Sequence, residues 1–475
     1  MMEKNYKCFI CNNQFSLAIE SHLQTHGISL PEYEILFGDL EREYKSCNYR
    51  NDITNHKCNL NCLPGSDYCI LHVDDVNKDK KKFIKIIRLL IKIYQSSKSE
   101  IHLEGIKVPI FINFSNIKFE NNAFFIGSYF YKNFDLKVTS NFILDFRCCV
   151  FKGRTSFKGS KFLNKCKFAQ AIFSKGVSFE NSLFNKEASF WETQFIGSGN
   201  FFKTVFEDRV RFIANKFPDS KSSSYMKFYD TNFKNPSHVL FANIDLTRVL
   251  FRWTDISEIR FDAVNWPTTS KLKGSRKYIA DEFYPFTKKK VHKTHNRDKY
   301  YSVVIDLYQQ LKKNYEDRRN FKEAGEFYYG EMECIRKSSI LRRYLPSFIN
   351  LYKISSGYGQ RYIRSIFVLF LLLLIFSSSH LYFGLKPNNL NISSTEVRYS
   401  INFSEIKDIS FLKEFFKDFV LSITYCIEVI TREEEQDRLF KPLTLYGEIV
   451  NHIFSILIYV QVLLFILALR RYFKR

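Results

Sequence analysis

The sequence is poor in the patterns that usually supply chemistry. We find no phosphate-binding loop, no nucleophile paired with a base and no metal pattern with an open position. Acidic side chains are also few, since 49 Asp and Glu stand against 71 Lys and Arg. These absences argue against an enzyme. The net charge of +22 favours contact with anionic lipid or nucleic acid without choosing between them.

An apolar run is missing from the start of the chain, where Met1 leads into charged residues and Cys8. A cleavable signal peptide requires such a run, so we expect the N-terminal region to stay in the cytosol. Six of the 11 Cys precede residue 70 and have His neighbours, which indicates metal ligation in a reducing compartment. At 475 residues, the chain should form several domains.

Residues 1–40 contain a first candidate zinc site. Its ligands Cys8, Cys11, His22 and His26 have the spacing C-x2-C-x10-H-x3-H. The two His lie one helical turn apart, so both can reach one tetrahedral Zn²⁺. The run KCFICNNQFSLAIESHLQTHGISLPEYEILFG resembles the single zinc finger of the Ros/MucR bacterial regulators, a family that binds DNA. The middle gap of ten residues differs from the twelve of the usual DNA-reading finger, so major-groove reading is not implied.

Residues 41–75 contain a second candidate zinc site, formed by Cys47, Cys58, Cys69 and His72. The ending SDYCILH looks like a small bacterial C-C-C-H zinc knuckle, with Cys62 as a substitute for Cys58. The alternative is a group of buried or unpaired thiols, which a polar, Asn-rich segment would bury poorly. A catalytic zinc keeps one position for water, whereas each set supplies four protein ligands, so both zinc ions should be structural.

Phe recurs with a fixed period in residues 101–267, where many of the 50 Phe lie. Steps of five and six alternate through Phe146, Phe151, Phe157, Phe162, Phe168, Phe173, Phe179, Phe184, Phe190, Phe195, Phe201, Phe206, Phe212 and Phe217. Steps of five precede this series at Phe114, Phe119, Phe124, Tyr129 and Phe134 and follow it at Phe241, Leu246, Phe251, Ile256, Phe261 and Trp266. A mostly small residue stands two positions before each large one. Neither a helix nor a strand has this period.

The pattern resembles the Phe-rich variant of the pentapeptide-repeat family. The resemblance implies a right-handed quadrilateral β-helix in which each Phe stacks on a Phe of the next coil, with Cys149 and Cys166 as small inward residues. Some members of the family imitate DNA through an acidic surface. Here Lys and Arg outnumber Asp and Glu, so DNA mimicry is disfavoured. A protein is the candidate partner of the β-helix.

Helices are expected on both sides of the β-helix. Residues 76–100 predict a basic amphipathic helix with Phe83, Ile86, Ile87, Leu90 and Tyr94 on one face, which either caps the first coil or lies on anionic lipid. Residues 268–360 predict a basic loop and a TPR-like helical pair that turns near Asn320. This pair also resembles a segment of bacterial membrane proteins that join pentapeptide repeats to a two-helix, channel-like end.

Residues 361–475 predict a transmembrane hairpin. Ser365 to Leu385 and Ile449 to Leu469 lack Lys, Arg, Asp and Glu and are long enough to cross a hydrocarbon core of ~30 Å. Arg361 and Arg364 precede the first span, and Arg470, Arg471, Lys474 and Arg475 follow the second. The positive-inside rule therefore places both termini in the cytoplasm, with the chain as a multi-pass protein of the inner (plasma) membrane.

Between the spans, Phe415 to Thr431 predicts a shorter re-entrant or interfacial helix, and the order resembles the two-transmembrane ion-channel module. No Gly occurs between Gly384 and Gly447, so a potassium filter of backbone carbonyls is not expected. Two sets of polar residues are candidates for a pore, namely Glu433, Glu434 and Glu435 as an acidic ring and His380, Asn451, His452 and Gln461 inside the spans. The alternatives are a solvated loop and helix packing, respectively.

The expected fold class is multidomain: small zinc modules, a β-helix, a helical linker and a transmembrane hairpin with a candidate re-entrant helix. The leading hypothesis is an oligomeric, channel-like membrane effector or sensor that receives a signal through its cytosolic part, and a bacterial antiphage role fits this plan. The alternative is a membrane-anchored scaffold that recruits protein or nucleic acid without conduction. Both hypotheses assume that the chain contacts membrane lipid and binds two structural Zn²⁺ ions, and neither assumes an enzyme.

Overall fold

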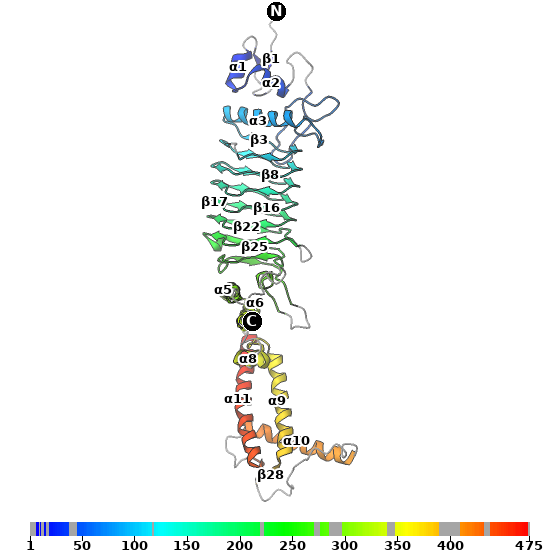
Figure 1. Cartoon of the computed structure of the whole chain (residues 1–475), viewed down its shortest axis with the longest axis vertical. Helices are drawn as coiled ribbons and strands as arrows, with labels where there is room; N and C mark the ends of the chain where they lie inside the picture. The colour runs from blue at the N-terminus through cyan, green and yellow to red at the C-terminus, as the bar shows by residue number, and fades with distance from the viewer. Residues whose placement is uncertain are drawn as a thin grey trace, which may run out of the picture. The chain divides into compact units, whose positions relative to one another are not determined.

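The computed structural model describes residues 6–8, 10, 14–15, 19–37, 45–115, 118–218, 223–269, 276–284, 297–339, 347–388, 409–431 and 438–473. It divides into two compact units, Met1–Asn314 and Tyr315–Arg475. The first contains the parallel β-strands, and the second contains the long apolar helices (Figure 1).

A β-solenoid of about seven turns dominates the first unit (Figure 1). Its strands are mostly two residues long and pair in parallel within four sheets. The longest sheet comprises β3 (Ile101–His102), β6 (Ala123–Phe124), β10 (Leu144–Asp145), β14 (Cys166–Lys167), β18 (Ala188–Ser189), β22 (Val210–Ile213), β25 (Val239–Ala242) and β27 (Arg260–Asp262). The next comprises β5 (Ile112–Asn113), β8 (Phe134–Asp135), β12 (Thr155–Ser156), β16 (Val177–Ser178), β20 (Gly199–Asn200), β23 (Met226–Lys227) and β26 (Val249–Leu250).

Two five-stranded sheets complete the four sides of the solenoid. One comprises β4 (Lys107–Val108), β7 (Tyr129–Phe130), β11 (Val150–Phe151), β15 (Ile172–Phe173) and β19 (Gln194–Phe195). The other comprises β9 (Thr139–Ser140), β13 (Lys161–Phe162), β17 (Leu183–Phe184), β21 (Val205–Phe206) and β24 (Asn232–Phe233). The predicted β-helix of the pentapeptide type is therefore present.

The register of the coils explains the aromatic period. Leu144 pairs with Cys166, and Cys166 pairs with Ala188, so one coil takes 22 residues. Four steps of the Phe spacing, two of five and two of six residues, also add up to 22 residues. Each Phe therefore lies above a Phe of the neighbouring coil. The rings of Phe146 and Phe168 stack with their centroids 5.4 Å apart. Every Phe of the predicted central series is buried, and so are the small residues that precede them.

The prediction for the first coils was wrong by one residue at two positions. The buried inward rings are Phe125 and Phe130, which stack on Phe146 and Phe151, whereas Phe124 and Tyr129 are partly exposed. Aromatic residues are adjacent at both places, so spacing alone could not choose between them. The register decides, because Phe124 pairs with Asp145 and leaves Phe125 beside Phe146. Downstream, the six predicted positions from Phe241 to Trp266 are all buried.

The N-terminal elements are β1 (Tyr6–Lys7), β2 (Gln14–Phe15), α1 (Ile19–Thr25), α2 (Leu30–Phe37) and α3 (Lys80–Ser96). Asp79 caps α3 by accepting hydrogen bonds from the Lys81 and Lys82 backbone N–H groups. The apolar side chains of α3, including Phe83 and Ile87, are buried, and the helix contacts β3 of the first coil and α2 (Figure 1). Because protein covers this apolar face, the structure favours the cap over the lipid-bound alternative.

The last coil is covered as well, by η3 (Ala280–Glu282) and α5 (Arg297–Asp317). The Asn314 amide donates hydrogen bonds to the carbonyls of Ile256 and Ile259, at 3.0 and 2.8 Å. These bonds satisfy backbone acceptors that the end of a solenoid would otherwise leave open. The predicted helical pair turns at Asn320, which caps α6 (Phe321–Ser338), but α5 begins eleven residues before the predicted Tyr308.

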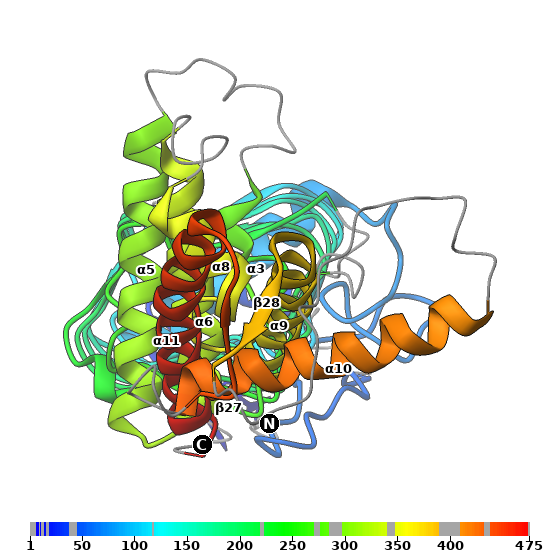
Figure 2. The same cartoon turned by 90° about the horizontal axis from the view of Figure 1, so that it is seen from below.

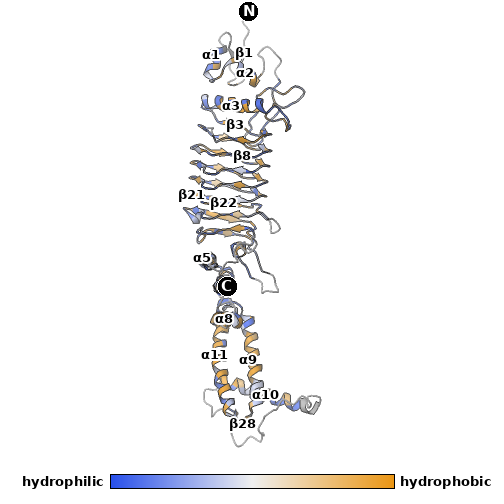
Figure 3. Cartoon of the chain, viewed as in Figure 1, coloured by the Kyte–Doolittle hydropathy of each residue, from blue (hydrophilic) through white to orange (hydrophobic). Residues whose placement is uncertain are grey.

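The second unit continues with α8 (Phe348–Ser356), α9 (Tyr362–Phe383), β28 (Leu385–Pro387), α10 (Ile409–Thr431), β29 (Phe440–Pro442) and α11 (Leu445–Phe473). The helices α9 and α11 are long and apolar enough to cross a membrane (Figure 3). They pack on each other, and β28 and β29 form an antiparallel pair. The first predicted span ran two residues too far, because α9 ends before Gly384, whose φ is +89°.

The predicted re-entrant or interfacial segment is the C-terminal part of α10, which lies crosswise to α9 and α11 (Figures 1 and 2). Its C-terminal half packs into the core of this unit through Tyr425, Cys426 and Val429. Its N-terminal half exposes Phe416 and Val420 beside charged side chains. The helix therefore has one half in the core of this unit and one half with an uncovered apolar face.

Candidate metal centre

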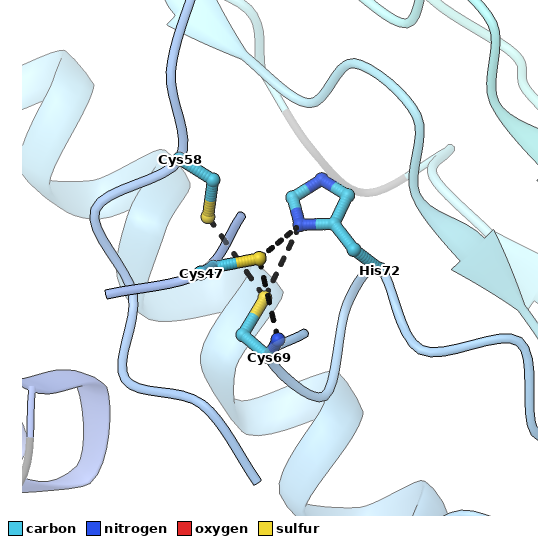
Figure 4. A group of neighbouring side chains, drawn as sticks. All are labelled: Cys47, Cys58, Cys69 and His72. Carbon is cyan, nitrogen blue, oxygen red and sulfur yellow. Dashed lines mark hydrogen bonds between the residues drawn. The ribbon is translucent and has the colours of Figure 1, made fainter. Parts of the chain in front are cut away.

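The four predicted ligands of residues 41–75 meet in one buried group, although they come from an irregular segment (Figure 4). Antiparallel bridges join Ser46 to Asn61 and Arg50 to Lys57, and this small hairpin brings Cys47 beside Cys58. A tight turn then brings the third thiol beside the imidazole, since the His72 backbone N–H donates to the Cys69 carbonyl at 3.1 Å. None of the four side chains is more than 9% exposed, so water does not compete for them.

The separations within the group fit one tetrahedral ion. With sulfur at ~2.3 Å and nitrogen at ~2.1 Å from the ion, a tetrahedron separates two sulfurs by ~3.8 Å and sulfur from nitrogen by ~3.6 Å. The Cys58 and Cys69 sulfurs are 3.8 Å apart. The Nδ1 atom of His72 lies 3.5 Å from the Cys47 sulfur and 3.2 Å from the Cys69 sulfur. The group can therefore hold a metal ion with little rearrangement.

Surrounding groups fix the ligand orientations. The Nε2 atom of His72 lies 2.9 Å from the Glu104 backbone carbonyl, which can only accept, so Nε2 carries the proton and Nδ1 faces the thiols. The Tyr49 ring stacks on His72 with centroids 4.0 Å apart. Gly105, at φ +66°, leaves room for that ring, because a Cβ there would lie 2.1 Å from a Tyr49 ring carbon. The first coil of the solenoid thus supports the metal group.

The electrostatics of the group favour one thiolate, at Cys47, whereas the neighbouring thiols and burial raise the pKa of Cys58. Hydrogen bonds from Cys58 and Cys69 lower the pKa of the Cys47 thiol well below its usual range. Burial lowers the pKa of His72, but hydrogen bonds to Cys47 and Cys69 outweigh this effect and raise it to about 9. An incoming metal ion would therefore displace protons from His72 and from Cys58 and would bind the thiolate already formed at Cys47.

Cys62, the predicted substitute for Cys58, lies outside the group. Its sulfur donates a 3.4 Å hydrogen bond to the Ser46 carbonyl, and its side chain is only partly buried. The fourth ligand position belongs to Cys58.

The first predicted site is assembled in part. Helix α1 contains His22 and ends at Thr25, and His26 directly follows it, so that the Nε2 atoms of the two His are 3.3 Å from each other. The Cys8 sulfur lies 3.6 Å from the His26 Nε2, so these three residues form a second group that could hold a metal ion. Cys11 lies outside the described residues.

The polar residues predicted within the apolar helices have different environments. The Gln461 amide donates to the Ser365 carbonyl at 2.9 Å and hydroxyl at 3.0 Å, which ties α11 to α9. His380 is buried with its ring edge against Tyr425. Asn451 is buried and His452 is exposed, and both line a polar cavity of about 320 Å³. Glu433, Glu434 and Glu435 lie outside the part of the chain that the structure describes.

Comparison with known families identifies the central coils. Residues 146–194 match the family described as pentapeptide repeats (9 copies). The matched segment runs from β11 to β19 and lies within the regular Phe series. No curated protein and no solved structure matches the chain.

Within the pentapeptide-repeat solenoid, Cys149 and Cys166 are fully covered, and burial raises the pKa of each thiol well above its usual value. The Cys149 sulfur donates to the Phe125 carbonyl at 2.9 Å. Both therefore fill the small inward position of the repeat, as the sequence predicted, and neither has the accessible thiolate of a reactive cysteine.

Proposed function

We propose that this chain is a membrane-embedded, oligomeric, channel-like effector or sensor. In this proposal the pentapeptide-repeat solenoid and the zinc modules receive a signal in the cytosol, and α9 and α11 act on the inner membrane. The observation that carries it is the uncovered apolar surface of the two helices. Only 22% of the most apolar stretch of each is buried, so lipid or further copies of the chain must cover the rest.

The charges at the helix ends support cytoplasmic termini. The Arg471 guanidinium donates to the Tyr358 carbonyl at 3.0 Å, and the Tyr362 and Tyr472 rings are 4.6 Å apart. The Arg-rich start of α9 therefore lies beside the Arg-rich end of α11. Because positive residues are retained on the cytoplasmic side, this common end should face the cytoplasm.

The metal is proposed to be zinc with a structural role. Three thiolates and one imidazole in a closed, buried tetrahedron are typical of structural zinc. The group joins the 45–79 segment to the start of the solenoid through His72 and Glu104, so the ion would hold that end together. The group of Cys8, His22 and His26 would hold a second zinc. Nucleic acid is the alternative partner of the zinc modules, because the chain carries a net charge of +22.

The test of conduction is a planar-bilayer recording of the full-length protein, purified in detergent and checked for oligomer formation. We compare it with a variant carrying Gln at Glu433, Glu434 and Glu435 and with a control carrying Gln at three solenoid carboxylates, Glu120, Glu187 and Glu192. Discrete currents whose cation preference falls only in the first variant would support the proposal. Folded oligomers that remain silent, with zinc and with cell extract added as a source of signal, would overturn it.

The second candidate, a membrane-anchored scaffold, is favoured by the hydrogen bonds of Gln461. Its amide is satisfied by Ser365 within a single chain and is not left facing a pore. In this case the helices anchor the chain, and the solenoid binds a protein partner. An antiphage role suits either candidate, and bacteria expressing the chain should then resist phage better than bacteria expressing a His72→Ala variant.

A further inference from the structure

We propose that His56, His102 and Glu104 form a further metal site, with two imidazoles, one carboxylate and an open position facing a cavity. These residues, named here the His–His–Glu site, come from two segments of the chain, since His56 lies 46 positions before His102 while Glu104 lies two positions after it. His56 belongs to the hairpin of the thiol group, whereas His102 lies in β3 and Glu104 follows it. One ligand atom of each residue lies within 4.8 Å of the others.

The first supporting observation is the position of the ligand atoms. The His102 Nδ1 atom is 2.8 Å from the Glu104 Oε1 atom, and the His56 and His102 rings lie parallel with centroids 4.1 Å apart. Ligand atoms bound at ~2.1 Å to one ion are separated by about 3 to 4 Å. Parallel rings aim their nitrogen lone pairs in parallel directions, so binding requires one ring to turn. His56 is suited to this turn, because it is partly exposed and its ring forms no hydrogen bond among the described residues.

The second, independent observation is the state of the Glu104 carboxylate. Glu104 is only 2% exposed, and its Oε2 atom has no hydrogen-bond partner among the residues that the structure describes. Its other oxygen receives the Thr54 hydroxyl at 3.2 Å and lies against His102. Burying a carboxylate with one oxygen unpaired is costly, and a cation bound at that oxygen would remove the cost.

The third observation is the space beside the site. A cavity of about 170 Å³ is lined in part by His56, His102, Glu104 and Tyr94, and Cys58 and His72 of the thiol group reach it from another side. Three protein ligands leave at least one position of a four- to six-coordinate ion free, and this cavity can admit water or a small anionic ligand to it. The site therefore differs from the closed thiol group, whose four ligands leave no such position.

The donor set indicates the class of ion. Imidazole and carboxylate without thiolate suit divalent first-row ions such as Zn²⁺, Fe²⁺ or Co²⁺. Glu104 would serve both centres, since its backbone carbonyl orients His72 while its side chain binds the second ion. A ligand at the open position would therefore act on Glu104, whose backbone carbonyl orients His72 of the thiol group.

The test is a Co²⁺ titration of the full-length, metal-stripped protein in detergent. Co²⁺ at the thiol groups gives sulfur-to-cobalt charge-transfer absorption, whereas Co²⁺ at a nitrogen and oxygen site gives only weak visible bands. We expect Glu104→Gln, His102→Ala and His56→Ala each to bind one Co²⁺ equivalent fewer than the wild type, with the charge-transfer absorption unchanged. The control is His238→Ala, an exposed His on the solenoid, which should match the wild type.

Two results would overturn the proposal. Wild-type stoichiometry in all three variants would show that these residues do not bind the ion. Loss of charge-transfer absorption together with the lost equivalent in every folded variant would show that they only support the thiol group. Because His56 is partly exposed, His56→Ala should fold even if the two other substitutions do not, and this variant alone can give either result.

Discussion

Replacing Phe179 by Ala tests the stacked rings of the solenoid. The Phe179 side chain is fully buried, and its ring stacks on Phe157 at 5.1 Å and on Phe201 at 4.9 Å. It also meets the edges of Phe168 and Phe190 at 5.3 and 5.7 Å. One substitution therefore removes a ring that holds three successive coils together.

The expected loss follows from burial and ring contacts. Truncating a fully buried Phe to Ala costs about 3–5 kcal/mol, and aromatic pairs contribute about 0.5–1.5 kcal/mol each beyond their buried area. With two stacked partners, Phe179→Ala should fall at the upper end, about 4–5 kcal/mol. Trp191 is 48% exposed on the same solenoid, so Trp191→Ala is a matched control that should cost less than about 1 kcal/mol.

The assay is urea unfolding of the full-length protein in detergent, combined with native-state hydrogen exchange read by mass spectrometry. Each coil contacts only its neighbours, so Phe179→Ala should reduce protection mainly in peptides between residues 146 and 212. A loss of stability no greater than that of Trp191→Ala would refute the reasoning. Lost protection concentrated outside these coils would refute it as well.

Three further predictions concern single residues. His72→Ala should lower the bound zinc by one equivalent by mass spectrometry, whereas Cys62→Ser, outside the metal group, should retain it. Gln461→Leu breaks the bonds to Ser365 and should cost about 1 kcal/mol in a micelle unfolding assay, and an unchanged midpoint would contradict this role. Hydrogen bonds from Arg336, Lys353 and Tyr358 outweigh burial and lower the pKa of Glu333 from 4.5 to about 2. The Glu333 carboxylate therefore adds stability above pH 4.5 that is lost as the pH falls through about 2, so Glu333→Gln should cost about 3 kcal/mol at pH 7 and much less at pH 2.

The solenoid was predictable from the sequence because its period repeats without error over the central coils. The spacing of the Phe residues from 146 to 217 is compatible with a single pairing register of the coils, and the structure has that register. The first coils were less predictable, because Phe124 with Phe125 and Tyr129 with Phe130 each offer two aromatic residues for one inward slot. The choice depends on which strand lies beside them, and a local pattern does not contain that information.

The metal groups show the same limit. Cys69 and His72 lie close in sequence and identify the thiol group, since a short turn can bring both to one ion. The Glu104 carbonyl that orients His72 could not be predicted, and neither could the proximity of His56 to His102. Both depend on how the hairpin packs on the first coil. Likewise, nothing in the sequence around Asn314 predicts that its amide covers the end of the last coil.

The 22-residue register of the central coils constrains how this chain can change in length during evolution. Duplication or deletion of 22 residues, such as 157–178, would leave matched partners at both junctions, because Thr155 and Val177 already pair across one coil. Each such event would lengthen or shorten the solenoid by one strand spacing, ~4.8 Å. Coils one or two residues shorter also pair, since Ala123 pairs with Leu144 and Leu240 with Arg260, but longer insertions must be looped out. Gly199 and Met226, which pair although 27 positions apart, flank an insertion of this kind, so the solenoid can gain length as a whole coil or as a loop between paired strands.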